Sequence, residues 1–165
     1  MPKRMLILGG YGNAGRPVAE LLLLHSDVHI RIAGRNEQRA KSLAAELNAK
    51  YGTDRTIGVV ADAASYQSLL TAFQGMDIVV VASSTSEYVA NVAKAAIECG
   101  SDYLDVQLSI EQKLAVLRDL EPLIREKDRL FTAISGRAAP KTGTLPAGAC
   151  GRTGEVYPGH QEYGD

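Results

Sequence analysis

The chain has 165 residues, 45% of them hydrophobic, which is enough apolar surface for one core but little for two domains. A formal net charge of −1 gives no general attraction to nucleic acid or to an anionic membrane surface. Two cysteines without histidines at ligand spacing argue against a disulfide framework or a metal site, and no apolar run is long enough for a leader or a membrane span. We therefore expect a cytoplasmic protein that binds no nucleic acid, membrane or metal; assembly into a homo-oligomer stays open.

Short apolar runs alternate with longer segments of helical periodicity, the pattern of strand–helix repeats in a parallel sheet. Six runs are candidate strands: 5–8, 28–33, 55–60, 77–82, 103–106 and 130–134. The runs 5–8 and 77–82 are apolar on both faces, as in central strands that are covered on each side. The run 28–33 instead alternates apolar residues with His29 and Arg31, so we expect this strand nearer an edge.

Three segments between these strands have apolar residues at steps of three and four. The first extends from Ala40 to Tyr51, and the second lies between Val89 and Ala96 and ends at Gly100. The third, 110–124, is expected to be one helix whose first turn has a capping box formed by Ser109 and Gln112. With right-handed crossovers, this order predicts a three-layer α/β fold with a doubly wound parallel sheet, the Rossmann fold, in strand order 3-2-1-4-5-6.

The composition changes after Ile134. Residues 135–165 contain seven of the 16 glycines and three of the six prolines. We predict one folded domain at 1–134 and a low-complexity or disordered tail at 135–165, because the tail can bury little apolar surface. The tail is expected to be either the product of a reading-frame shift or truncated gene, or a natural flexible extension.

A glycine-rich segment follows the first expected strand and opens the helix expected from about Asn13. Its G-x-G-x-x-G spacing falls on Gly10, Gly12 and Gly15, which permit a tight turn, close approach of a pyrophosphate and close packing of the helix. Free N–H groups at the helix start attract phosphates. The motif predicts a dinucleotide site at Gly10, Tyr11, Gly12, Asn13, Ala14 and Gly15; the alternative is a glycine turn without a ligand.

The end of the second expected strand indicates which dinucleotide is bound. NAD-preferring sites usually have Asp or Glu there, whereas this chain has Ala33-Gly-Arg-Asn36. Arg35 can pair with a 2′-phosphate, Gly34 leaves the phosphate room, and Asn36 can donate to it and cap the next helix. These residues favour NADP(H); the alternative is that Arg35 is a solvated cation and Asn36 only a cap.

Polar residues also follow the third, fourth and fifth expected strands. Asp62 either accepts a hydrogen bond from the adenine amino group or caps the following helix. Ser83 and Ser84 either meet the pyrophosphate or nicotinamide ribose or form an N-cap run. For Asp105 and Gln107, a turn or cap role is favoured over one beside the nicotinamide.

Candidates for acid–base catalysis are few. His25 and His29 flank a turn at the end of the sheet opposite the glycines, and His160 lies in the tail. Cys99 lies near a helix C-terminus, which raises a thiol pKa, so it is expected to be a core residue. No catalytic residue is assigned.

Four segments together resemble the NADP-binding domain of saccharopine dehydrogenase-like oxidoreductases: Met5–Gly15, Ala33–Arg35, Val60–Asp62 and Asp102–Asp105. The resemblance extends from Met5 to about Ile134. It implies NADP(H) as cofactor, with its phosphates at the glycine motif, its 2′-phosphate at Arg35 and its adenine at Asp62. It also implies a following substrate and dimerisation domain, and substrates that are secondary amines formed between amino acids and carbonyl compounds.

Two functions remain open. The chain is expected to be the NADP(H)-binding domain of such an oxidoreductase without its substrate domain, because residues 135–165 lack the periodicity of a second domain. The alternative is a non-catalytic NADP(H)-binding redox sensor or regulatory module. A classical short-chain dehydrogenase is excluded, since no lysine has a tyrosine four residues before it.

Overall fold

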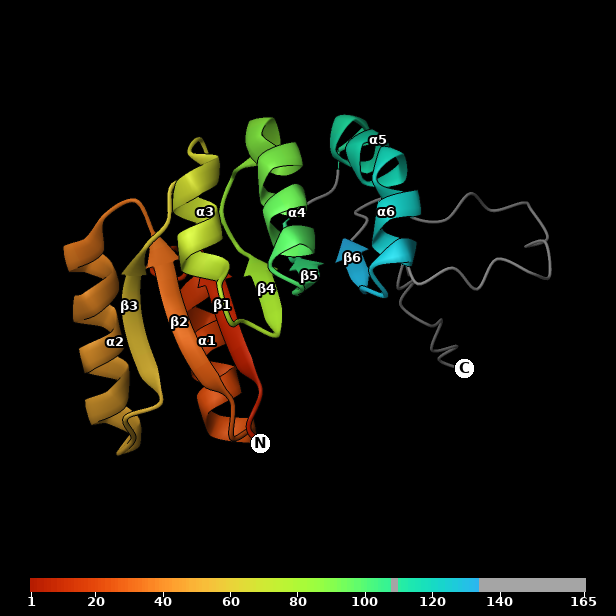
Figure 1. Ribbon diagram of the computed structural model, residues 1–165. Coiled ribbons are helices and arrows are strands. Elements are labelled where there is room, and N and C mark those ends of the chain that lie inside the picture. The colour runs from red at the N-terminus through yellow and green to blue at the C-terminus, as the bar shows by residue number, and fades with distance from the viewer. Residues whose placement is uncertain (108–109, 134–165) are drawn as a thin grey trace, which may run out of the picture.

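The computed structural model describes residues 1–107 and 110–133 (Figure 1). Within them, a six-stranded parallel sheet has the order β3-β2-β1-β4-β5-β6. The strands are β1 (Arg4–Leu8), β2 (His29–Gly34), β3 (Thr56–Val60), β4 (Ile78–Val81), β5 (Asp102–Asp105) and β6 (Phe131–Ala133). The predicted fold class and strand order are confirmed. Ile134 and the predicted tail, 135–165, lie outside the described residues.

The helices lie on both faces of the sheet. They are α1 (Gly15–His25), α2 (Glu37–Tyr51), α3 (Tyr66–Phe73), the 3₁₀ turn η1 (Ser86–Tyr88), α4 (Val89–Glu98), α5 (Glu111–Asp119) and α6 (Glu121–Glu126). In Figure 1, α1 lies behind the sheet and α3 to α6 lie in front of it. Buried residues of α2 share a core cluster with α1, so α2 covers the same face as α1. Among the described residues, no helix has the length and apolar character needed to cross a membrane.

Local sequence explains why α2 forms where it does. Asn36 Oδ1 accepts the Arg39 N–H at 2.9 Å, which caps the helix start, and Gly52 ends it in the left-handed conformation at φ 59°. The predicted apolar stripe, including Ala40 and Leu47, is buried against β2 and β3. Helix start, stop and buried face therefore agree with the sequence pattern.

The segment 110–124 differs from its prediction as one helix. It forms α5 and α6, which meet at Leu120, and Pro122 lies in the first turn of α6. Proline has no N–H and its ring clashes with the carbonyl four residues earlier, so the helix cannot continue through it. Ser109 lies outside the described residues, and Ile110 precedes α5 without a side-chain cap.

The alternating strand β2 lies between β3 and β1, one position from the sheet edge, as expected. Ile30 and Ile32 are buried towards α1 and α2. Arg31 faces the other side, where its Nη1 donates to the carbonyls of Ala72 (2.9 Å) and Gln74 (3.0 Å) at the end of α3. Arg31 thus satisfies two carbonyls at the C-terminal end of α3.

Candidate functional site

A cleft of about 620 Å³ opens at the carboxyl ends of the strands. It is lined by the glycine loop, the end of β2, and the segments that follow β3 and β4. Open parallel sheets bind ligands in this position, between strands whose crossovers go to opposite faces. The predicted site residues among its lining are Tyr11, Gly12, Asn13, Ala14, Arg35, Asp62, Ser83 and Ser84. Gly10, Gly15 and Asn36 are not part of the lining.

The glycine loop is closely packed behind the cleft and open towards it. A Cβ on Gly15 would lie 2.4 Å from the Gly9 oxygen, so α1 can approach the loop only because this residue is glycine. A Cβ on Gly12 would have one neighbour within 4 Å, the Gly9 oxygen at 3.0 Å. The rest of the space around it is open, because Gly12 lines the cleft. Within this loop, the glycine with a positive φ is Gly9, at +80°, which the G-x-G-x-x-G spacing did not identify. α1 begins at Gly15 rather than near Asn13.

Tyr11 joins the glycine loop to the end of β2. Its hydroxyl accepts the Asn36 N–H at 3.0 Å, and the Arg39 guanidinium lies 4.6 Å from its ring centroid. A Cβ on Gly34 would lie 2.5 Å from the ring. The space that a side chain on Gly34 would occupy therefore holds the Tyr11 ring, while Gly34 itself lines the cleft; its predicted role of leaving room for a phosphate stays a prediction. Asn36 confirms its predicted cap role.

Arg35, Asp62 and Tyr88 all line the cleft. Arg35 is exposed and lies on the rim. The Glu87 carboxylate, burial and Asp62 together raise the pKa of the Tyr88 hydroxyl above its ordinary value, while Arg35 acts to lower it. These charges are close enough to interact, so a cation, a carboxylate and an aromatic ring meet where Arg35 and Asp62 alone were predicted.

Asp62 does not cap the following helix. Ser65 is the N-cap of α3, and its side chain accepts the Ser68 N–H. Asp62 Oδ1 instead accepts the Ala64 N–H at 3.1 Å, and its backbone N–H is bound by the Ser68 hydroxyl. This local turn fixes the carboxylate at the cleft wall.

Ser83 and Ser84 follow β4 and line the cleft. Ser83 Oγ is buried without a hydrogen-bond partner among the described residues. The N-caps of η1 and α4 are Thr85 and Tyr88, and within the described chain neither has a side-chain cap hydrogen bond, so these serines are not an N-cap run. A buried hydroxyl without a partner is costly, so a polar group that reached it would stabilise this part of the cleft wall.

The end of β5 contains a buried ion pair that the sequence did not suggest. Lys113 Nζ lies 2.7 Å from Asp105 Oδ2, and both side chains are almost fully buried. Asp105 also accepts the Tyr103 hydroxyl (3.1 Å) and the Gln107 N–H (2.8 Å). Asp105 thus has the expected turn role together with a partner from α5. Only Gln107 of this group lines the cleft.

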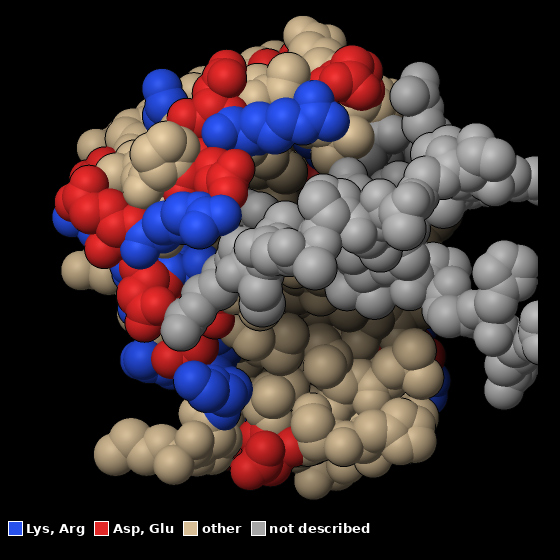
Figure 2. All heavy atoms as spheres, turned by 90° about the vertical axis from the view of Figure 1, so that its right-hand side faces the viewer, with Lys and Arg blue, Asp and Glu red and all other residues tan. Residues whose placement is uncertain are grey.

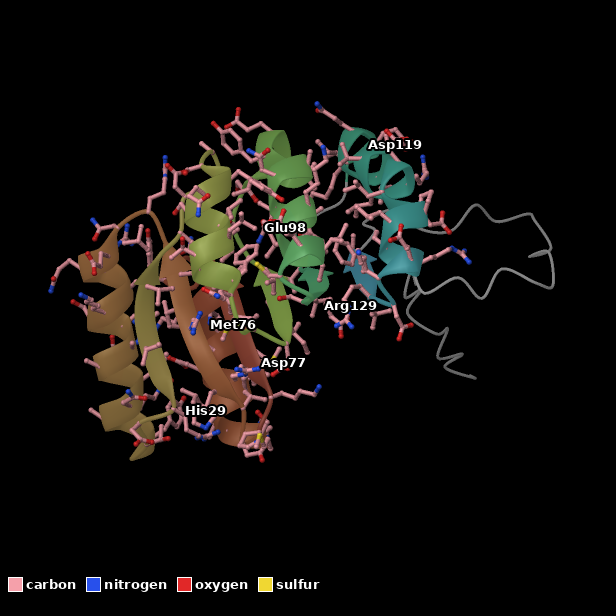
Figure 3. The ribbon with its side chains drawn as sticks, viewed as in Figure 1. His29, Met76, Asp77, Glu98, Asp119 and Arg129 are labelled. Atoms are coloured by element: carbon pink, nitrogen blue, oxygen red, sulfur yellow. The ribbon has the colours of Figure 1, made fainter. Side chains whose placement is uncertain are left out.

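His25, His29 and Cys99, which the sequence did not favour for catalysis, are not part of the cleft lining, and His160 lies outside the described residues. His29 is near Met76 and Asp77 at the amino ends of the strands, beside a separate hollow of about 580 Å³ (Figure 3). Burial raises the pKa of the half-buried Cys99 thiol, which contacts the Leu70 carbonyl. No histidine or cysteine is among the described residues that line the cleft, and no group of acids, histidines and cysteines in that part of the chain has metal-binding geometry.

The cleft has the features that a phosphorylated dinucleotide requires. Gly12 leaves open space at the start of α1, where backbone N–H groups and the helix dipole favour a pyrophosphate. Arg35 supplies a cation at the rim, and Ser83 supplies an unpaired hydroxyl within. The residues present therefore fit this class of cofactor.

Comparisons with known proteins agree with this geometry. The family model described as the saccharopine dehydrogenase NADP binding domain matches residues 5–133. No curated protein sequence matches the chain.

Three solved structures have similar folds. Saccharopine dehydrogenase (L-Glu forming) from Saccharomyces cerevisiae is 22% identical with a TM-score of 0.63, over 79% of this chain and 26% of that one. Triphenylmethane reductase from Citrobacter sp., complexed with NADP(H), is 21% identical with a TM-score of 0.60, over 82% of this chain and 50% of that one. A short-chain dehydrogenase/reductase from Veillonella parvula in complex with NADP is 18% identical with a TM-score of 0.58, over 82% of this chain and 69% of that one. The chain thus spans about a quarter of the first and half of the second.

Proposed function

The chain belongs to the family of saccharopine dehydrogenase NADP-binding domains over residues 5–133, and on this premise we propose that its cleft holds NADP(H) as the cofactor-binding part of an oxidoreductase. The observation that carries the proposal is the placement of the glycine loop and Arg35 on one cleft at the carboxyl ends of the strands. In this proposal the glycine loop takes the pyrophosphate and Arg35 the 2′-phosphate of one ligand, as in other dinucleotide-binding folds.

The pyrophosphate lies over Gly12 in this proposal. The open side of Gly12 admits a phosphate to the backbone, and the N–H groups of Asn13 and Ala14 directly precede α1, whose dipole attracts it. Gly10 and Gly15 act indirectly, since an added Cβ on either would meet the loop or strand backbone at less than 3 Å.

The 2′-phosphate pairs with Arg35. No acidic residue lies between Ile32 and Asn36 to bind a free ribose hydroxyl or to repel the phosphate. Arg39, which stacks on Tyr11, adds a second cation beside the same turn. The Asn36 side-chain amide remains a donor because its cap bond uses only Oδ1.

The adenine lies between Arg35 and the Asp62 turn, with the Tyr88 ring at the same end of the cleft. The nicotinamide half extends towards Ser83 and Ser84, where the unpaired Ser83 hydroxyl provides a donor or acceptor. This orientation directs the reactive ring towards Gln107 and away from the strand amino ends.

NADP(H) supplies hydride transfer, and the residues of this chain bind and orient it. Proton transfer to or from a substrate also needs a group of suitable pKa within reach. Among the described cleft residues, no histidine or lysine has that position. We therefore propose that a substrate-binding partner domain completes the reaction. The same observation favours the second candidate, a non-catalytic NADP(H)-binding sensor or regulatory module.

Binding is tested by titrating the full chain with NADPH and following nucleotide fluorescence. Gly12→Val places an isopropyl group in the proposed phosphate position and should abolish saturable binding. Ala45→Val, on the exposed face of α2, is the matched control and should bind as wild type. Binding retained by a folded Gly12→Val variant would contradict the proposal.

Turnover separates the two candidate functions. NADPH oxidation by the purified chain with secondary amines and with their amino-acid and carbonyl precursors should remain at background. Oxidation that depends on substrate and disappears in Gly12→Val would show that the chain has its own active site. If no partner domain ever confers turnover on a chain that binds NADPH, the sensor function is favoured.

A further inference from the structure

The hollow of about 580 Å³ at the amino ends of the strands lies where α3 leaves the front face of the sheet uncovered. α3 has eight residues and is therefore about 12 Å long. β2 has six residues and is about 20 Å long. Figure 1 shows α3 over the upper part of β1 and β2 only. The hollow is thus at the end of the sheet opposite the cofactor cleft.

Strand alternation places the polar side chains of β1 and β2 in this hollow. Leu6 is buried in the front cluster, and its register partners are Arg31 on β2 and, beyond it, Ile57 on β3. Arg31 and Ile57 therefore also face the front. Arg4 and His29, each two residues before one of these positions, share that face. Arg4, His29, Arg31 and Ile57 all line the hollow.

Arg31 is fixed through one nitrogen and leaves one edge of its guanidinium open. Its Nη1 donates to the carbonyls of Ala72 and Gln74 at the end of α3. Within the described part of the chain, no hydrogen bond uses its Nε or Nη2. These two nitrogens form an edge that can bind both oxygens of one carboxylate. Because the side chain is already held and only partly exposed, little freedom is lost when this edge binds an anion.

The charges of the hollow are unbalanced. Its lining has three cations, Lys3, Arg4 and Arg31, against one carboxylate from the described residues, Asp77. Asp77 is engaged by Arg4, since Asp77 Oδ2 accepts the Arg4 N–H at 2.7 Å and lies 3.5 Å from its Nε. Lys3 and Arg31 take part in no ion pair with another described residue. The excess positive charge favours an anionic occupant.

The surface of α5 and α6 provides the contrast. There Arg118 pairs with Glu111, and Arg125 pairs with Glu121. Figure 2 shows Lys and Arg side chains next to Asp and Glu on this side of the molecule. Cations that are matched in this way leave no local excess of charge, so the hollow differs from an ordinary solvated surface.

The hollow also has an apolar part. Ile57, the neighbour of Arg31 in the sheet, is 52% exposed, and the buried Met76 lies in the wall. Figure 3 shows Met76, Asp77 and His29 in the same region of the front face. The volume is within the range of about 300–1,000 Å³ that is usual for small-molecule sites, which combine apolar walls with a few polar groups.

We propose that this hollow binds a small organic carboxylate with an apolar body. The carboxylate lies on the open edge of Arg31 beside Lys3, and the apolar body covers Ile57 and Met76. Inorganic phosphate would use the cations but leave Ile57 in water, and an uncharged apolar molecule would leave the cations unmatched. The site shares no residue with the cofactor cleft and does not depend on the proposed function.

Calorimetric titration of the full chain with octanoate tests the site. One octanoate should bind per chain, and 1-octanol and inorganic phosphate should each bind at least about tenfold more weakly. Arg31→Gln should weaken octanoate binding at least about tenfold, because the bidentate cation is lost. Arg55→Gln is the matched control: Arg55 also donates to helix-end carbonyls, those of Leu23 and Ser26, but it does not line the hollow. This variant should bind octanoate as wild type does.

Two further variants keep the test decisive if Arg31→Gln does not fold. Lys3→Ala, at an exposed position, should weaken octanoate binding about threefold or more, and Ile57→Asp should abolish it by placing a carboxylate beside Arg31. Circular dichroism and the thermal midpoint establish that each variant folds. Saturating NADPH should leave the octanoate affinity unchanged.

No octanoate binding at about 10 mM would overturn the proposal. Octanol or phosphate bound as tightly as octanoate would do the same, as would an affinity that Lys3→Ala and Ile57→Asp leave unchanged. Displacement of octanoate by NADPH would place it in the cofactor cleft and so contradict a separate site. A chain that binds octanoate but no NADPH would contradict only the proposed cofactor function.

Discussion

The two halves of the sheet obtain their structure in different ways. Around β1, β2 and β3, helices cover the rear face, and the cleft is shaped by backbone geometry at Gly9, Gly12 and Gly15. Around β4, β5 and β6, described helices cover the front face only, and the end of β5 is held by the ion pair of Asp105 and Lys113. The first half thus depends on close backbone packing at the glycine loop, whereas the second depends on a buried ion pair between the end of β5 and α5.

Breaking the ion pair should give the largest effect. Lys113→Met leaves the Asp105 carboxylate buried without its cation and should lower the free energy of unfolding by about 3–5 kcal/mol in urea titrations. The double variant Lys113→Met with Asp105→Asn removes the buried charge and should recover more than half of that loss. A loss below about 1 kcal/mol for Lys113→Met would show that the second half does not depend on this pair.

Arg35→Ala tests the first half. It should weaken NADPH binding by about 1.5–3 kcal/mol, the scale of a charge-assisted contact, with little change for NADH. Calorimetric titration gives both values. Lys41→Ala, another exposed cation near the same turn but outside the cleft lining, serves as the control and should leave both affinities unchanged. Equal losses for the two nucleotides would mean that Arg35 does not recognise the 2′-phosphate.

Tyr11 offers a smaller test of the same region. Tyr11→Phe keeps the ring on Gly34 but removes the acceptor of the Asn36 N–H, so NADPH affinity should fall by less than about 1 kcal/mol. Tyr11→Ala also removes the surface under Arg39 and should cost more. If Tyr11→Phe and Tyr11→Ala weaken NADPH binding equally in fluorescence titrations, the Tyr11 ring does not organise the turn.

The smallest expected effect concerns acid stability. Asp77 accepts the Arg4 N–H at 2.7 Å, which, with the nearby guanidinium, holds the pKa of this carboxyl below its ordinary value. Its stabilisation is therefore present above the ordinary aspartate pKa of about 3.9 and is lost as the pH falls through the lowered folded value. In the Asp77→Asn variant, the urea midpoint of unfolding should therefore fall less steeply with decreasing pH than it does in the wild type. Asp27→Asn, at another exposed turn, should retain the wild-type slope.

What the sequence predicted and what it missed do not divide between the two halves of the sheet. The strand order and the Asn36 cap were predictable, because they follow from apolar periodicity and short-range backbone requirements. The Tyr11 contact with Gly34 and the ion pair of Lys113 were not, since they join residues brought together only by the fold. Lys113 lies four residues before the buried Leu117, so helical spacing placed it on the buried face, but no signal in the sequence identified Asp105 as its partner. The helix break at Leu120 could have been predicted from the sequence, because Pro122 lies inside the expected helix.

The most direct test of the central claim is calorimetric titration of the wild-type full chain with NADPH and with NADH under identical conditions. The proposed cleft predicts one site per chain, with NADPH bound at least about tenfold more tightly, equivalent to about 1.4 kcal/mol. Equal affinity for the two nucleotides, or no binding of either, would contradict it.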